Sequence, residues 1–263
     1  MAGSTANPAP AWSNEYDANL TKEIINRQHI LHVSFLTKDS EYPTVCYLVG
    51  KIFKCNDDPE ALYVHGHVQE PVLGRLKGIE KGDPDICVSV AASTVNSHYL
   101  GFSGFATGFS FANTVLNGTA SLVGVSEDTK SEREEIMKRI VNSQIPDRWD
   151  HLRPIGTDVQ YVSIIKITPN AQKSHTHSVP RVLGLEVQND VEDKELCAEH
   201  WEGAIPFWEK LGQPISGKNN LPEGKARVAP QYIYDFIEEQ NAKNEYSARQ
   251  IASADYPYDY PRH

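Results

Sequence analysis

Short apolar segments, separated by clusters of turn-forming residues, dominate the first two thirds of the chain. Turn clusters such as DSEYP and CNDDPE stand between these segments. Six segments have the length and the content of β-branched and aromatic residues that are typical of strands: 30–37, 43–53, 61–67, 86–93, 111–125 and 161–169. This pattern predicts a small, mostly antiparallel β-barrel with helical insertions, which is an α+β fold.

Helical segments interrupt the predicted strands. Residues 17–29 and 72–79 carry apolar side chains at helical spacing, and Pro71 suits the first position of a helix. A third helix is predicted to begin at a capping box that runs from Thr129 to Glu132. The strand at 61–67 therefore leads almost directly into a helix.

The remaining segments predict the domain organisation. Residues 94–110 are rich in Gly, Ser and Thr and predict a long loop, a candidate lid. Two aromatic patches, HWEGAIPFWEKLG and PQYIYDFIEEQN, follow the barrel, and the second predicts a helix at 230–241. We expect four regions: a flexible tail (1–16), the barrel domain (17–180), a C-terminal arm that packs on the barrel or on a dimer partner (181–245), and a loose tail (246–263).

Composition and charge narrow the possible partners and the location. The formal net charge of −10 argues against nucleic acid, which needs clustered Lys and Arg. No run of 18 apolar residues is present, so no membrane span is expected, and the N-terminus lacks the apolar core of a secretion signal. The four cysteines show no metal-binding or redox spacing, which favours free thiols and a cytoplasmic location.

Five motifs carry a resemblance to a known family. They are LYVHGHV at 62–68, EKGDPDICVSV at 80–90, FANTVLNGTASLV at 111–123, PDRWDHLRP at 146–154 and HWEGAIPFWEKLGQPISG at 200–217. In order and spacing they resemble the pyridoxamine-phosphate-oxidase-like, FMN-binding split-barrel family, in particular its fungal flavin-nucleotide-binding branch. The resemblance implies a six-stranded antiparallel split β-barrel, a homodimer, and FMN in a groove between the two barrels.

The residues that hold the FMN phosphate in that family are replaced in this chain. A Ser-Ser-Arg segment, a Tyr-Arg-Ser segment and a Lys-x-Arg segment are matched here by Gln69-Glu70-Pro71, Phe111-Ala112-Asn113 and Lys173-Ser174-His175. Because each charge-assisted hydrogen bond contributes on the order of 1.5–3 kcal/mol, these changes could remove roughly 4–8 kcal/mol of binding energy. We therefore expect that the protein has no cofactor, and the alternative is that it binds FMN.

Histidines supply the candidate catalytic chemistry. His65 and His67 alternate on a predicted strand and so share a face, where imidazoles could transfer protons near neutral pH. The alternative is that one or both are packed barrel residues. A second pair, His175 and His177, has side chains of a type that can bind a metal. No acidic residue stands at a sequence spacing that would complete a metal site, so no metal is expected. The predicted substrate-binding residues are Tyr47, Gln69, Phe109, Phe111, Asn113, Lys173, His175 and Trp201.

Three functions remain compatible with the sequence. The first is an enzyme that uses the groove, without FMN, for a non-redox isomerisation or cyclisation of a small organic molecule, as in secondary metabolism. The second is an FMN-dependent oxidoreductase of the resembled family. The third is a non-catalytic binder of a small ligand. The same fold can support all three, so the fold does not decide between them.

Overall fold

The structure is a computed structural model that divides into two compact units. It describes residues 15–36, 41–67, 72, 86–124, 126, 128–156, 158, 162–179, 188–217, 219 and 228–253. The ring unit comprises Ser13–Thr94 and Asn113–His177, and the arm unit comprises Met1–Trp12, Val95–Ala112 and Ser178–His263. Residues 1–14 of the expected tail (1–16), the turn at 68–71 and residues 73–79 of the expected second helix lie outside the described residues.

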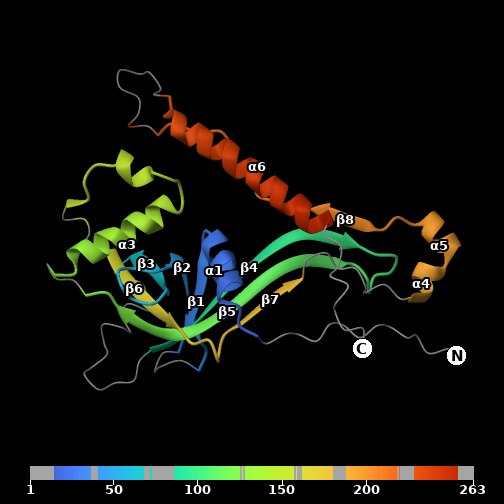
Figure 1. The fold of residues 1–263 in the computed structure, drawn as a ribbon, viewed down its shortest axis with the longest axis horizontal. Coiled ribbons are helices and arrows are strands. Elements are labelled where there is room, and N and C mark those ends of the chain that lie inside the picture. Colours follow the sequence, from blue (N-terminus) through green and yellow to red (C-terminus); the bar gives the residue numbers. More distant parts are fainter. Residues whose placement is uncertain are drawn as a thin grey trace. The chain divides into compact units, whose positions relative to one another are not determined.

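Strand pairing in the described residues gives one eight-stranded sheet in the order β7-β5-β6-β3-β2-β1-β4-β8, and β5 also pairs with β4 (Figure 1). Six strands therefore form a closed ring of pairings, and every pairing with an assigned register is antiparallel. This confirms the predicted α+β, mostly antiparallel fold. The strands are β1 (Leu31–Phe35), β2 (Thr44–Phe53), β3 (Ala61–His67), β4 (Ile86–Leu100), β5 (Gly108–Leu122), β6 (Val162–Pro169), β7 (His175–Val179) and β8 (Gly203–Pro206).

Strand β3 lies at the centre of the ring unit and is covered on both faces. It pairs with β2 on one side and with β6 on the other. Residues 61–64 are each at most 1% exposed, so the usual alternation of buried and exposed side chains is absent here. One face packs into the ring, and the other packs beneath a helix. His65, the next residue of this strand, is therefore held by a well-packed backbone.

Helix α3 (Lys130–Asn142) covers the outer face of β3 and β6 (Figure 1). Ile136 and Ile140 of this helix form one hydrophobic cluster with Tyr63 and Ile164. The predicted capping box is not formed, because the Thr129 side chain makes no capping bond to the helix. Its hydroxyl donates instead to the Gly124 carbonyl at 2.7 Å and so closes the preceding turn.

Helix α1 (Ala18–Arg27) is fixed at its start by Asp17, whose carboxylate accepts a 2.9 Å bond from the Leu20 amide. The buried Thr21 hydroxyl lies 3.0 Å from that of Thr114 on β5 and 2.6 Å from that of Thr176 on β7. Apolar burial and these hydroxyl contacts together hold the helix to the ring strands. The prediction of a helix at 17–29 is thus confirmed to within two residues at its end.

In the arm unit, the expected loop at 94–110 is largely strand, so that prediction is wrong. β4 continues to Leu100 and β5 begins at Gly108, and Ser97 and Tyr99 are at most 1% exposed. Ser, Thr and Gly suggested a loop, but pairing with β5 and β8 satisfies the backbone of these residues. β4 lies antiparallel to β8, with His98 opposite Ile205.

The remaining arm unit is helical. It contains α4 (Gln188–Glu192), α5 (Lys194–Glu199) and α6 (Gln231–Ser253). α6 extends beyond the expected helix at 230–241, and the expected boundary at 245 falls inside it. The Asn241 side chain exchanges two hydrogen bonds with the Leu211 backbone, and the Arg249 guanidinium lies 5.5 Å from the centre of the Trp208 ring. No helix in the described residues is long and apolar enough to cross a membrane.

Candidate functional site

His65 lies on the outer face of β3, between two other strands of the ring. It is directly opposite Val49 of β2 and Ile164 of β6, so its ring has apolar neighbours on both sides. The residue is half-buried, and this burial lowers the pKa of its imidazole below the usual 6.5. The imidazole is therefore neutral at neutral pH, and it can exchange hydrogen bonds with a ligand as either donor or acceptor.

His67 is the last residue of β3, and its backbone lies opposite Val162 of β6. Gln69, in the turn that follows, lies outside the described residues. The catalytic role expected for this histidine pair stays a prediction.

Tyr47 precedes Val49 by two residues on β2 and so shares the face on which His65 lies. Its side chain is 65% exposed, and its ring meets that of His32 edge to face, with centroids 5.2 Å apart. An exposed aromatic ring beside a half-buried imidazole can bind a flat organic group. Tyr47 and His65 are therefore the pair of predicted site residues that the ring unit places on one face of neighbouring strands.

A second group of predicted site residues meets where β5 pairs with β7. Thr114, next to Asn113, donates a 3.2 Å hydrogen bond to the His175 carbonyl, and the Asn117 amide donates a 2.5 Å bond to the Lys173 carbonyl. Asn113 and His175 are half-buried, whereas the Lys173 side chain is exposed. Asn113, Lys173 and His175 thus lie on neighbouring segments, on β5 and at the start of β7, and we call these three residues the β5–β7 corner.

The β5–β7 corner does not meet His65 within one chain. Leu122 of β5 and Val64 of β3 both lie opposite Ile165 of β6, whereas Asn113 is in the first half of β5. Strand β6 also separates β5 from β3. The predicted single site therefore consists of two separate parts in the ring unit.

The second histidine pair is not assembled into a metal centre. His177 is 8% exposed, and burial lowers its pKa, with a smaller contribution from the neighbouring His175. In the part of the chain that the structure describes, no group of three or more His, Cys, Asp and Glu residues is placed to hold a metal ion.

The other predicted site residues lie in the arm unit. Phe109 is 51% exposed and Trp201 is 65% exposed, while Phe111 is half-buried. The centre of the His98 ring lies 5.0 Å from that of the Phe109 ring and 6.4 Å from that of the Phe207 ring. The sequence had placed His98 in a loop, so its position on an aromatic sheet face was missed.

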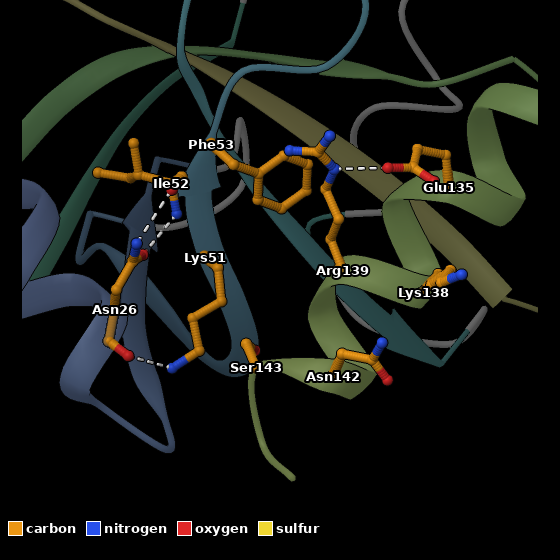
Figure 2. A pocket seen from close by; sticks show the side chains of 9 residues that line it. All are labelled: Asn26, Lys51, Ile52, Phe53, Glu135, Lys138, Arg139, Asn142 and Ser143. Carbon is orange, nitrogen blue, oxygen red and sulfur yellow. Dashed lines mark hydrogen bonds and ion pairs between the residues drawn. The ribbon is translucent and has the colours of Figure 1, made fainter. Parts of the chain in front are cut away.

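A pocket of about 410 Å³ opens between α1, β2 and α3 of the ring unit (Figure 2). Its lining includes the ammonium groups of Lys51 and Lys138, the guanidinium of Arg139 and the ring of Phe53. Sequence reasoning missed this pocket. The available signal was Lys51, a charged residue inside the apolar segment 43–53.

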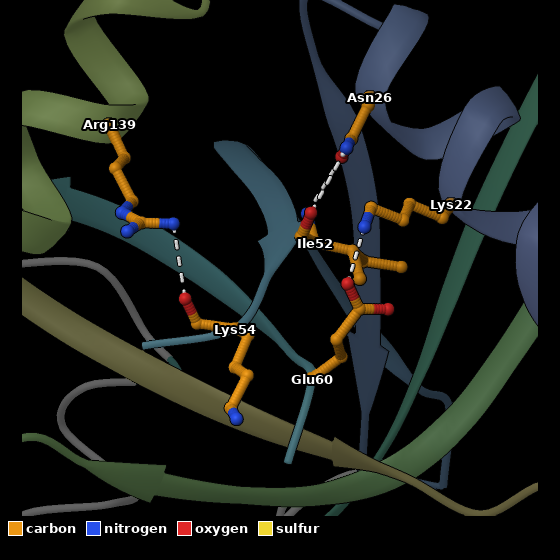
Figure 3. Close-up of polar contacts among 6 residues, drawn as sticks. All are labelled: Lys22, Asn26, Ile52, Lys54, Glu60 and Arg139. Atoms are coloured by element: carbon orange, nitrogen blue, oxygen red, sulfur yellow. Dashed lines mark hydrogen bonds and ion pairs between the residues drawn. The ribbon is translucent and has the colours of Figure 1, made fainter. Parts of the chain in front are cut away.

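The walls of this pocket are joined by polar contacts (Figure 3). The Asn26 side chain exchanges two hydrogen bonds, of 2.7 and 3.0 Å, with the backbone of Ile52, and so pairs with β2 as a neighbouring strand would. Lys22 of α1 forms an ion pair with Glu60, and Arg139 of α3 donates a 3.1 Å bond to the Lys54 carbonyl. These contacts fix α1 and α3 on either side of β2.

Comparison with known proteins yields structural matches but no sequence match. No protein-family model and no curated protein sequence match the chain. The flavocytochrome Anf3 from Azotobacter vinelandii matches with a TM-score of 0.62 and 19% identity, over 84% of this chain and 91% of that chain. The FAD and heme binding protein from Mycobacterium smegmatis matches with a TM-score of 0.65 and 15% identity, over 86% and 96% of the two chains.

These matches contradict the expectation that the chain works without a cofactor. That expectation rested on the missing phosphate anchors alone, whereas both matched structures are flavin or heme proteins by name. The Ala112 side chain is 6% exposed and offers no donor, and it stands where the resemblance implied an arginine. The donors of the β5–β7 corner nevertheless suit an anionic group, since a carboxylate or phosphate needs N–H groups and positive charge.

The two structural matches show which fold the chain has. The match to both structures spans most of this chain and most of each matched chain, and at this level of identity it establishes the fold. The fungal branch and the homodimer stay predictions. The chain therefore shares its fold with the flavocytochrome and with the FAD and heme binding protein.

Proposed function

We propose that this chain binds a flavin nucleotide and acts as a flavin-dependent redox protein on a small organic substrate. The observation that carries the proposal is the fold shared with two proteins named for flavin or cytochrome function, over 84% and 86% of the chain. The −10 net charge and the absence of clustered Lys and Arg favour a small-molecule ligand over nucleic acid.

The β5–β7 corner would hold the flavin's phosphate. The exposed Lys173 ammonium supplies the positive charge, and the Asn113 amide and His175 imidazole supply directional donors. A bound flavin supplies transfer of one or two electrons. Because Ala112 and His175 stand where the family has arginines, the grip on the phosphate rests on Lys173 more than on a bidentate pair.

His65 would contact the bound organic groups from β3. Its neutral imidazole can donate a proton at one nitrogen and accept one at the other, and Tyr47 offers a flat wall on the same face. The isomerisation or cyclisation suggested by the sequence presupposed a groove without flavin, so it is not part of this proposal. Proton transfer by His65 fits a redox reaction equally well.

A homodimer is part of the proposal, because the two parts of the site lie apart in one chain. A second subunit can bring its β5–β7 corner to the His65 face of the first, as the resemblance implies. Light scattering should then give twice the 29.4 kDa mass of one chain. A monomer that binds flavin fully would contradict this part.

The role of Lys173 is tested by flavin titration of matched variants. Lys173→Gln should weaken FMN or FAD affinity about tenfold, as expected for one charge-assisted bond. Lys194→Gln, an exposed lysine on α5, is the control and should bind as the wild type does. Equal affinity in all three proteins would place the phosphate elsewhere.

Heme is a second candidate ligand, favoured by the environment of His98. This exposed imidazole is near the rings of both Phe109 and Phe207, and Ile205 lies opposite His98 on β8. Heme iron takes an axial imidazole and its porphyrin packs on apolar side chains. Hemin should give a Soret band that His98→Ala removes and His32→Ala keeps. An unchanged spectrum in His98→Ala would reject this site.

A further inference from the structure

The pocket between α1, β2 and α3 carries more positive than negative charge, although the chain as a whole is acidic. Three cationic side chains line it, Lys51, Lys138 and Arg139, against the carboxylate of Glu135 in the lining and that of Asp150, which lies 3.7 Å from the Lys138 ammonium. The full chain has 35 acidic and 25 basic Lys and Arg residues. A local excess of positive charge on such a chain attracts anions to this pocket.

Several donors in the pocket keep unused hydrogen-bonding capacity. The Lys51 ammonium donates to the Asn26 and Gln28 carbonyls at 2.6 and 2.8 Å, which leaves its third N–H. The Asn142 side-chain oxygen accepts from the Trp149 amide at 2.7 Å, which leaves its NH₂ group. These donors are held by backbone contacts, so they are already oriented before a ligand binds.

Arg139 is positioned as a second anchor. Its Nε donates to Glu135 at 2.6 Å and its Nη1 donates to the Lys54 carbonyl at 3.1 Å, while its guanidinium lies 5.3 Å from the centre of the Phe53 ring. Figure 2 shows the guanidinium beside this ring, and the Lys51 ammonium on the α1 side of the pocket. The Nη2 group remains to bind an oxyanion.

We propose that this pocket binds a small organic phosphate monoester, with the phosphate on the cationic side chains and the organic body against the part of the half-buried Phe53 ring that Tyr63, stacked on it at 4.7 Å, leaves open. A dianionic phosphate complements the excess positive charge, and its several oxygens can accept from ammonium, guanidinium and amide donors together. A volume of about 410 Å³ has room for a small organic molecule. The site is distinct from the β5–β7 corner and does not depend on flavin binding.

Thermal stability with added ligand tests this site. Phenyl phosphate should raise the melting temperature of the wild type in a saturable manner at constant ionic strength, because a ligand that binds only the folded state stabilises it. Inorganic phosphate should act about tenfold more weakly, since it lacks the group that contacts Phe53. The same weak response to both would show that the organic body is not recognised and would overturn the proposal.

Variants then show whether phenyl phosphate binds in this pocket. Arg139→Gln should weaken phenyl phosphate binding about tenfold, and Lys138→Gln should weaken it by a smaller factor. Lys130→Gln, on the same helix but outside the pocket lining, and Lys173→Gln, in the β5–β7 corner, should respond as the wild type does. Circular dichroism confirms that each variant is folded. An undiminished response in both pocket variants, or its loss in Lys173→Gln, would overturn the proposal.

Discussion

Lys51 and Asn26 are joined by a 2.6 Å hydrogen bond from the Lys51 ammonium to the Asn26 backbone carbonyl, at the C-terminal end of α1. A second bond, of 2.8 Å, runs from the same ammonium to the Gln28 carbonyl. The Lys51 residue is only 6% exposed, and burial lowers its pKa from 10.5. Because carbonyls at a helix C-terminus attract positive charge, the charge of Lys51 stabilises this end of the helix.

Replacing Lys51 should therefore destabilise the protein. Lys51→Met keeps the apolar stem but leaves both carbonyls without their donor, and we expect the free energy of unfolding to fall by about 3 kcal/mol. Urea unfolding followed by circular dichroism measures the change. Lys54→Met, at an exposed position of the same segment, should leave stability nearly unaltered. Equal losses in the two variants would mean that the Lys51 bonds contribute nothing specific.

Arg133 should be a second large contributor to stability. It is 1% exposed on α3 and donates to the Val123 carbonyl at 3.1 Å and to the Val162 carbonyl at 2.5 Å, so it joins the helix to the end of β5 and the start of β6. Arg133→Met should lower the unfolding free energy by about 3 kcal/mol. The exposed Lys130→Met on the same helix is the control. A loss below about 1 kcal/mol would contradict the bridging role.

The lowered pKa of His65 predicts a pH dependence of stability. Between its folded pKa and the unfolded value of 6.5, the unfolded chain binds more protons, so this residue's contribution is present above pH 6.5 and is lost as pH falls through the folded pKa. His65→Gln should remove that contribution to acid sensitivity. Unfolding free energies measured from pH 7.5 to about 5 should show a shallower loss than in the wild type.

The control for that series is His32→Gln, an exposed histidine on β1. It should retain the acid sensitivity of the wild type. The buried His177, whose pKa is also lowered, remains in both variants and keeps part of the dependence. A His65→Gln profile that parallels the wild type would show that His65 is solvated in the folded protein.

The strands of the ring were predictable because their apolar content is strong and turn residues separate them. Each of the six expected segments overlaps a strand, although β4 and β5 extend beyond theirs. The strands of the arm unit were not predictable, because the second half of β4 is polar. Its Ser97 is nevertheless buried, and it pairs with β8, a segment distant in sequence. The capping box failed for a related reason, because Thr129 bonds the preceding turn at Gly124 in place of the helix.

The candidate site was predictable in its residues more than in its assembly. The sequence predicted that His65 and His67 share a strand face, and the resemblance pointed to Asn113, Lys173 and His175 as site residues; these roles stay predictions. That the last three lie on neighbouring segments follows from the pairing of β5 with β7, which local patterns do not encode. The role of Lys51 was missed because the carbonyl groups that it binds belong to the end of α1, and the sequence does not show that this end lies beside β2.

Flavin binding by the purified chain tests the central claim most directly. The protein is mixed with FMN and, in a parallel sample, with FAD, and each mixture is passed through a gel-filtration column. We predict that one of the two flavins elutes with the protein, at a stoichiometric ratio, and that its visible absorbance and quenched fluorescence move with the protein peak. Complete separation of both flavins from a folded protein would contradict the proposed function.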